Sequence, residues 1–310
     1  MFAVLAYLLG VVLTVTYGIR WTRYRAAARA ELRDPMLGAL HATLPGGLLV
    51  LAVMTASVGP ALFSDTVVTA IVAVLAGAGA VLAVVIGVVF TYELFVGERS
   101  AAAVNGGWFI PPVVTIIIPM ALAPLLSHVD ETVGRALLVL GYAAYGLGMV
   151  LFLLTLALLY GRLVLLSLPP APLAPTLWIV LGPVGVGCVA PLSLAALSAP
   201  YMGEAAGAVG SLSLIGGTAL WGFGLFWRAL ATSLLIRYTR TGGVPFHLGW
   251  WAFTFPLGAY TVATITLARA WQSSMIEAFG ALLSIALAAF WVVVTSRTLA
   301  ATRTGTVWRR

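Results

Sequence analysis

Nine long apolar runs, separated by short polar segments, fill almost the whole of this 310-residue chain. A helix of about 20 apolar residues crosses the ~30 Å hydrocarbon core of a lipid bilayer. Inside lipid every backbone polar group must be bonded within the protein, so only helices and closed barrels are stable there. Barrel strands alternate apolar and polar residues with a period of two, and these runs do not. The runs therefore predict an all-α integral membrane protein.

Composition supports the same class. Hydrophobic residues make up 62% of the chain and charged residues 8%, whereas soluble domains carry about 25% charged residues. We place the nine membrane spans at 1–21, 37–58, 66–96, 106–127, 135–166, 175–198, 207–237, 246–270 and 276–298. The loops between them are too short for an extramembrane domain. The sequence therefore predicts a single transmembrane domain over residues 1–310.

The arginines predict how the chain is oriented. The net charge is +7, and cytoplasmic loops of membrane proteins carry an excess of basic residues. The basic residues are therefore predicted to orient the protein in the membrane rather than to bind nucleic acid. One set of loops and the tail contain Arg20, Arg23, Arg25, Arg29, Arg33, Arg99, Arg162, Arg237, Arg240, Arg297, Arg303, Arg309 and Arg310. The other side has only Arg135 and Arg269, so we predict an N-terminus outside and a cytoplasmic C-terminus in the plasma membrane.

Prolines divide the spans into two alternating kinds. The second, fourth, sixth and eighth spans contain Pro45, Pro111, Pro112, Pro119, Pro183, Pro191 and Pro256, and the other five contain none. A proline inside a helix removes a backbone donor and kinks the helix. Membrane proteins tolerate such breaks where neighbouring protein or a water-filled cavity re-satisfies the freed backbone groups. We therefore predict helix hairpins whose kinked members line a shared axis; the alternative is that the prolines kink helices for packing alone.

The alternation also leaves the first straight span without a kinked partner. Ten helices would complete five hairpins, whereas nine leave one hairpin half formed. From this pattern we expect that a kinked helix precedes Met1 in the full reading frame, or that the chain is a truncated form.

Motifs of enzymes and pumps are absent from the sequence. There is no GxSxG, HExxH or Walker A motif and no carboxylate cluster of a metal site. The three histidines lie on different segments, and the one cysteine, Cys188, lies in an apolar run. We therefore predict no cofactor and no metal, and a pore or secondary carrier rather than an enzyme or a nucleotide-driven pump.

The proline-containing spans carry almost no charge, which bears on what they could conduct. Only His41, His247 and the terminal Arg269 are basic there, and no Asp or Glu lies at depth. Cation pathways use acidic side chains, whereas broken helices hold anions with exposed N–H groups and positive helix ends. The pattern favours small inorganic or carboxylate anions. His41 and His247 are the possible titratable groups of the alternative function, a proton-coupled carboxylate carrier.

One arginine lies inside a span. Arg228 precedes Arg237 by nine residues, about 13 Å along a helix. We predict an intramembrane ion pair with Glu93; the alternatives are that Arg228 snorkels to the membrane surface or takes part in transport.

Three segments resemble the tellurite-resistance/dicarboxylate transporter family. They are Trp250–Pro256 (WWAFTFP), Trp108–Val114 (WFIPPVV) and the Asp34-Pro35 pair before the second span. The family includes plant slow-type anion channels, bacterial TehA-like channels and fungal malate transporters, within the voltage-dependent anion channel superfamily. The resemblance implies ten helices in five hairpins around a central pore, a homotrimer, and our nine spans as the family's second to tenth helices.

By the same resemblance a phenylalanine closes the pore. The aligned residue is Phe255, with Phe253 as the alternative. The pore-lining prolines would be Pro45, Pro112, Pro183 and Pro256. The substrates implied are chloride, nitrate, sulfite, monocarboxylates, C4-dicarboxylates and tellurite-related oxyanions. A third interpretation, motivated by the expected missing helix, is a truncated, non-conducting family member.

Overall fold

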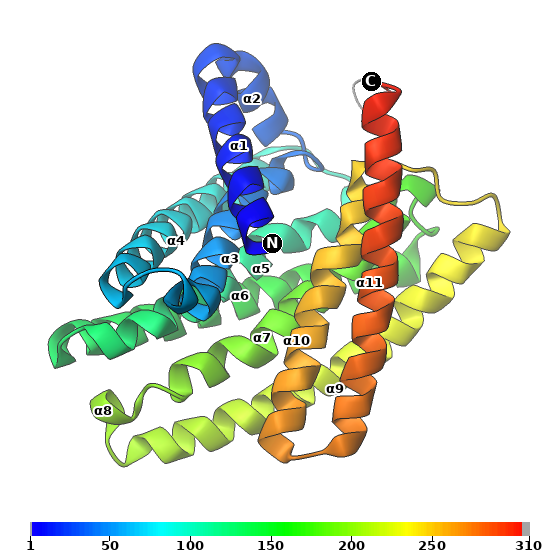
Figure 1. The fold of residues 1–310 in the computed structure, drawn as a ribbon. Coiled ribbons are helices and arrows are strands. Elements are labelled where there is room, and N and C mark those ends of the chain that lie inside the picture. Colours follow the sequence, from blue (N-terminus) through cyan, green and yellow to red (C-terminus); the bar gives the residue numbers. More distant parts are fainter. Residues whose placement is uncertain (1, 306–310) are drawn as a thin grey trace. The chain divides into compact units, whose positions relative to one another are not determined.

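The computed structural model describes residues 2–305, which are helical with short connections and contain no strand. Nine stretches of the described residues are long and apolar enough to cross a membrane. The main α-helices are α1 (Phe2–Arg23), α3 (Thr43–Val58), α4 (Asp65–Val96), α5 (Ile110–Leu122), α6 (Glu131–Leu165), α7 (Leu181–Ala195), α9 (Ala205–Arg240), α10 (Thr254–Trp271) and α11 (Ser274–Arg303) (Figure 1). The predicted all-α membrane fold is confirmed, and the predicted spans agree within a few residues with the nine apolar stretches, which include 3-10 segments as well as these α-helices.

The chain divides into two compact units. The first contains residues 1–103, 110–153 and 190–210, and the second contains residues 104–109, 154–189 and 211–310. Three of the boundaries pass through α6, α7 and α9, so the chain continues from one unit to the other within these helices. The single transmembrane domain stays a prediction, and each unit is described by itself.

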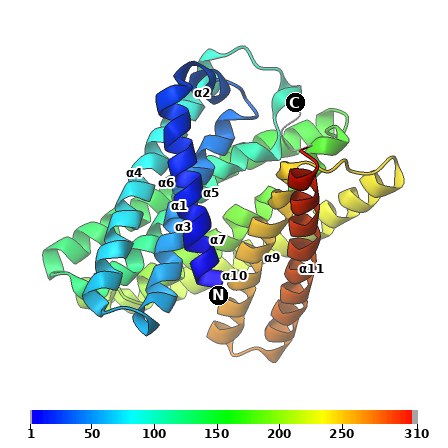
Figure 2. The ribbon, with the colours of Figure 1, turned by 45° about the horizontal axis from the view of Figure 1, so that its top comes forward.

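In the first unit, α3 and α4 form a hairpin, α5 packs against both, and α1 runs along α3 (Figures 1 and 2). Small residues allow the close approach. A Cβ atom at Gly46 of α3 would lie 2.9 Å from Val114 of α5, and one at Gly79 of α4 would lie 2.8 Å from Leu49. Membrane helices associate through such contacts because lipid gives them no hydrophobic driving force toward each other.

In the second unit, α10 and α11 lie side by side and antiparallel, joined by a short turn (Figure 2). The segment of α7 in this unit packs against α10 at Gly185, where a Cβ atom would lie 2.4 Å from the carbonyl carbon of Ala259. A Cβ atom at Gly224 of α9 would meet the ring of Tyr260 at 2.2 Å. Glycines therefore set the separation of helices in both units.

Each proline-containing span begins as a 3-10 helix and continues as an α-helix. The 3-10 segments are Gly38–Ala42, Gly106–Phe109, Ala171–Val180 and Leu248–Phe253. They lead into α3, α5, α7 and α10, and the third residue of each of these α-helices is a proline: Pro45, Pro112, Pro183 or Pro256. Proline is tolerated in a first helical turn because the missing N–H has no intrahelical acceptor there. These four prolines thus start a new α segment, where the sequence suggested kinks within a helix.

Pro119 and Pro191 differ, because they lie inside α5 and α7 and do remove an intrahelical donor. The two kinds of span also differ in burial. In the most apolar stretch of each span, 39, 83, 89 and 56% of residues are buried in the four proline-containing spans, against 0 to 28% in the five straight ones. The proline-containing helices are therefore the more enclosed set.

Two short helices lie outside the predicted spans. α2 (Arg25–Leu32) follows α1 directly, and α8 (Ala199–Met202) precedes α9. The alanine-rich sequence of α2 favours a helix, and an ion pair between Arg20 and Glu31 ties it back to α1. The basic loop after the first span is therefore a folded helix.

An apolar groove of about 620 Å³ runs between α1 and α3. Leu9 and Leu13 line it from α1, Gly47 and Leu51 line it from α3, and Arg20 lies among its lining residues.

Candidate functional site

The start of α10 is fixed by a histidine. His247 Nε2 lies 2.8 Å from the carbonyl oxygen of Pro172, and His247 Nδ1 accepts a hydrogen bond from the Gly249 N–H at 3.0 Å. A carbonyl only accepts and an N–H only donates, so the ring is neutral with its proton on Nε2. His247 thereby caps the 3-10 helix Leu248–Phe253 and holds it to the segment before α7.

Phe253, at the end of this 3-10 helix, is a core residue. Its side chain is 2% exposed. Its ring centroid lies 5.6 Å from Trp178, 5.3 Å from Phe290 and 5.8 Å from Trp250. Edge-to-face and stacked arrangements at these distances are the favourable geometries of aromatic pairs. Phe253 therefore joins the entrance of α10 to α11 and to the 3-10 segment before α7.

Phe255, two residues later, is in a different environment. Its side chain is 42% exposed, although the next residue, Pro256, is buried. Val262 is 50% exposed, and Arg269 is exposed as well. These residues recur every seven positions, so they lie along one face of the helix. Of the two predicted gate residues, Phe255 is the one whose ring is open.

The predicted pore-lining prolines Pro45, Pro112, Pro183 and Pro256 are buried, and so are the two prolines inside helices, Pro119 and Pro191. Neighbouring groups bond carbonyls close to two of the breaks. Trp227 Nε1 donates to the Leu177 carbonyl at 2.9 Å, six residues before Pro183. Thr115 Oγ1 donates to the Pro111 carbonyl at 3.0 Å. Neither carbonyl is the one that a proline frees, which lies four residues before it, and the pore-lining role stays a prediction.

His41, the other titratable candidate, is packed among aromatic rings. It is 6% exposed, and its Nδ1 lies 2.7 Å from the hydroxyl oxygen of Tyr17. The rings of Tyr17 and Trp21 meet it edge-on at 5.7 and 6.0 Å. These contacts join α1 to the start of α3, which is a structural role.

Arg228 and Glu93 each have contacts within their own unit. The Arg228 guanidinium carbon lies 5.2 Å from the centre of the Phe279 ring. Glu93 lies 3.7 Å from Arg33, and its carbonyl accepts a hydrogen bond from Arg99 at 3.4 Å. Since Arg228 and Glu93 belong to different units, the predicted pair between them stays a prediction.

We expect Arg228→Ala to lower thermal stability while leaving anion selectivity unchanged. A cation over an aromatic ring contributes about 0.5–2 kcal/mol, and alanine removes both the charge and the packing of the alkyl chain. Arg228→Lys should retain part of the stability. Thermal denaturation in detergent and reversal potentials in bilayers measure the two effects. Altered selectivity in a variant that assembles normally would show that Arg228 contacts the transported ion.

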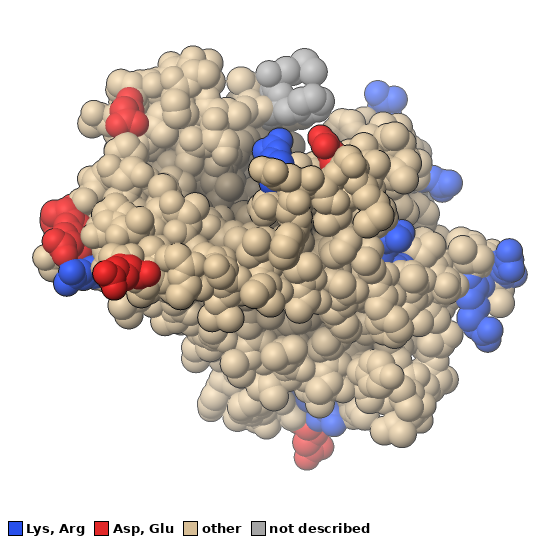
Figure 3. Space-filling view, turned by 90° about the horizontal axis from the view of Figure 1, so that it is seen from below, with Lys and Arg blue, Asp and Glu red and all other residues tan. Residues whose placement is uncertain are grey.

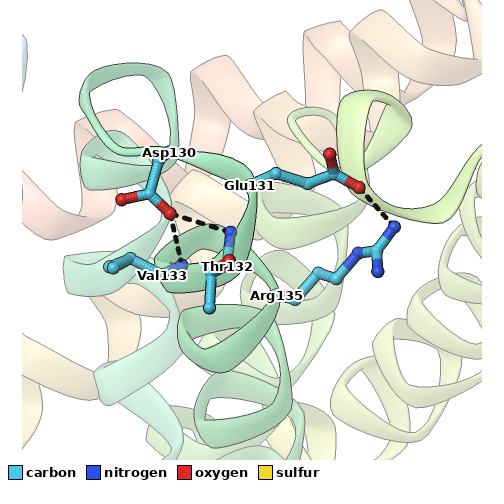
Figure 4. A network of polar contacts seen from close by, with 5 residues as sticks. All are labelled: Asp130, Glu131, Thr132, Val133 and Arg135. Carbon is cyan, nitrogen blue, oxygen red and sulfur yellow. Dashed lines mark hydrogen bonds and ion pairs between the residues drawn. The ribbon is translucent and has the colours of Figure 1, made fainter.

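The two acidic residues at the start of α6 have structural partners, and Asp130 caps the helix. Asp130 Oδ1 accepts hydrogen bonds from the N–H groups of Thr132 and Val133 at 2.8 and 3.0 Å, and Arg135 pairs with Glu131 (Figure 4). In the described part of the chain, no three His, Cys, Asp or Glu side chains gather as a metal site would require.

Figure 3 shows how few charged side chains lie on one face of the molecule.

A hollow of about 630 Å³ lies at the turn between α10 and α11, and the sequence did not predict it. Arg269, Gln272 and Glu277 line it. From the sequence, Arg269 is predicted only to be a charged residue at a helix end. Its seven-residue spacing from Val262 and Phe255 is the feature that could have linked it to the predicted gate, because this spacing places all three residues on one helix face.

Comparison with known proteins places this sequence among membrane transporters. The family model described as "voltage-dependent anion channel" matches residues 1–299. An uncharacterized transporter of Methanocaldococcus jannaschii is 30% identical, over 97% of this chain and 84% of its own. A second one from that organism is 29% identical, over 91 and 79%. A sulfite efflux pump of Arthroderma otae is 30% identical over 64% of this chain, which spans about half of that protein (54%).

Proposed function

Because the chain belongs to the voltage-dependent anion channel family, whose members transport ions and catalyse no reaction, we propose that it is a passive channel for small anions, closed by Phe255. Transport of anions follows from the family and from the relatives named as sulfite efflux pumps. The passive mechanism, the path along the proline-containing helices and the role of Phe255 are the parts that we add.

The exposed Phe255 ring on α10 is the observation that carries the proposal. Half of the 18 residues of α10 are buried, yet this large apolar side chain is exposed beside a buried proline. An aromatic ring that projects from an enclosed helix can fill a narrow path and exclude water from it, which stops ions. The proposal is tested by the anion current of the wild type and Phe255→Ala in lipid bilayers under a salt gradient. A reversal potential that follows the anion supports it.

The charge of the enclosed helices supports anions over cations. The described residues of the four proline-containing spans include no Asp or Glu. In the predicted orientation, the N-termini of α3, α5, α7 and α10 all point toward the cytoplasm, where their positive dipole ends attract anions. A neutral path with positive helix ends suits ions of several shapes, and it needs no arginine clamp for two carboxylates.

Among the candidate anions, sulfite is the first to test, because three similar fungal proteins are named as sulfite efflux pumps. Chloride, nitrate, monocarboxylates, C4-dicarboxylates such as malate, and tellurite-related oxyanions complete the series. We further propose a homotrimer, which the family resemblance implies, and a location in the plasma membrane. The arginine distribution supports a cytoplasmic C-terminus.

The alternative, a proton-coupled carboxylate carrier, requires a group that takes up and releases a proton during transport. Both ring nitrogens of His247 are engaged with backbone groups, and His41 is enclosed by aromatic rings. These contacts favour structural roles for both histidines and support the passive channel. Flux that responds to a pH gradient across the membrane would favour the carrier instead.

We expect His247→Ala to destabilise the protein by about 1–2 kcal/mol, in the range of a lost helix cap. His247→Asn should cost less, because its side-chain oxygen can still accept from the Gly249 N–H. Neither variant should alter how flux depends on a pH gradient. Denaturation midpoints and flux with and without the gradient are the measurements. If either variant removed a pH dependence seen in the wild type, His247 would be a proton-coupling group.

A further inference from the structure

The hollow at the α10–α11 turn contains the groups that bind small anions. Arg269 supplies a guanidinium, Gln272 an amide, and Ser274 and Ser284 hydroxyls. The guanidinium, the amide and the Ser274 hydroxyl can donate hydrogen bonds to an anion, and the guanidinium adds a permanent positive charge. The Ser284 hydroxyl instead donates to the Gly280 carbonyl at 2.9 Å. Glu277 lines the same hollow and opposes that charge. The hollow has a volume of about 630 Å³, which is large enough for a hydrated inorganic anion.

Arg269 lies on the same face of α10 as Phe255. The two residues are separated by two seven-residue steps through Val262, which corresponds to about 21 Å along the helix axis. Phe255 and Val262 are 42 and 50% exposed, whereas Leu257 and Tyr260 between them are buried. The hollow therefore opens at the far end of the open face that carries Phe255.

Arg269 also differs from the other arginine predicted on this side of the membrane. Arg135 is paired with Glu131, four residues earlier (Figure 4). Arg269 has no carboxylate within ion-pair distance among residues 2–305, although Glu277 lines the same hollow. Its charge is therefore available to an ion from solution.

We propose that this hollow is an anion-binding vestibule at the outer end of the conduction path, in which Arg269 concentrates inorganic anions ahead of Phe255. The inference rests on the proposed channel function. A unit charge about 6 Å away in water raises the local anion concentration about threefold. The enrichment depends on ionic strength, because screening acts over about 10 Å at 0.1 M salt and about 3 Å at 1 M.

The experiment compares single-channel conductance in the Phe255→Ala background with and without Arg269→Gln. At 20 mM chloride we expect Arg269→Gln to lower the conductance about threefold, and at 1 M we expect equal values. Glu277→Gln should raise the conductance at low salt, because it removes the opposing charge. Arg135→Gln is the matched control and should have no effect. If the conductance at 20 mM chloride is the same with and without Arg269→Gln, the proposed vestibule is wrong.

A second measurement tests the vestibule without any current. Trp271, two residues from Arg269, is 48% exposed, and its Nε1 donates to Thr218 Oγ1 at 2.8 Å. Iodide quenches exposed tryptophans on contact, and the difference between wild type and Trp271→Phe isolates this residue. In purified protein at low salt, Arg269→Gln should lower its Stern–Volmer constant about threefold. If Arg269→Gln leaves the Stern–Volmer constant unchanged, the vestibule is rejected. If Phe255→Ala conducts no anions but Arg269→Gln still lowers the Stern–Volmer constant, the proposed channel is rejected and the anion-binding hollow is not.

Discussion

Phe255→Ala should raise anion conductance at least about tenfold over the wild type. A ring that fills a narrow apolar constriction must be displaced, or the ion dehydrated, before passage. Each 1.36 kcal/mol removed from that barrier increases the rate tenfold, and alanine removes the whole ring. The ring is 42% exposed and has no aromatic partner among the described residues, so its removal should cost little stability. Planar bilayer recordings of purified protein under a chloride gradient give the conductance and the sign of the permeant ion.

Phe253→Ala is the matched control, because it removes the same side chain two residues away. That ring is buried against Trp178, Trp250 and Phe290. Its loss should lower the free energy of unfolding by about 3–5 kcal/mol, as for other buried phenylalanines, without a matching rise in conductance. Phe255→Leu should fall between wild type and Phe255→Ala. Unchanged conductance of a normally expressed Phe255→Ala protein would refute the gate, and opening by Phe253→Ala alone would transfer the role to Phe253.

The spans could be predicted from the sequence because lipid imposes one requirement on all of them. A run of about 20 apolar residues has no stable alternative to a helix in a bilayer, so the ends of α4 and α9 agree with prediction within a few residues. The 3-10 segments were not predicted, because that choice depends on how the start of each enclosed helix packs. α2 was missed for a related reason: its helix is short, and an ion pair with Arg20 supports it.

Several properties of the candidate site depend on residues that are distant in the sequence. Phe253 and Phe255 are the same residue type and lie within one motif, so the sequence alone does not decide which of them closes the pore. Their difference comes from Phe290, 37 residues away on α11, which stacks on Phe253. His247 likewise depends on Pro172, which is 75 residues distant. Such partners are set by tertiary packing, and a motif read along the chain does not contain them.

Gly185→Ala should prevent the second unit from folding correctly. A Cβ atom at this position would lie 2.4 Å from the carbonyl carbon of Ala259 and 2.5 Å from the amide nitrogen of Tyr260. These are backbone atoms of α10, which cannot turn aside as a flexible side chain can. Overpacking usually costs about 1–3 kcal/mol, and a clash between two backbones should cost at least the upper part of that range. The denaturation midpoint in detergent should fall sharply, with loss of a single peak in gel filtration.

Gly222→Ala provides the comparison for this substitution in the same unit. Gly222 lies on α9, where an added Cβ atom meets nothing within 4 Å. Alanine is favoured over glycine in a helix by about 1 kcal/mol, so this variant should be as stable as the wild type or slightly more stable. Equal midpoints for Gly185→Ala and the wild type would contradict the direct contact of α7 with α10. That contact lies one helical turn from Phe255, so a shift of α10 at Gly185 would also move the ring that we propose as the gate.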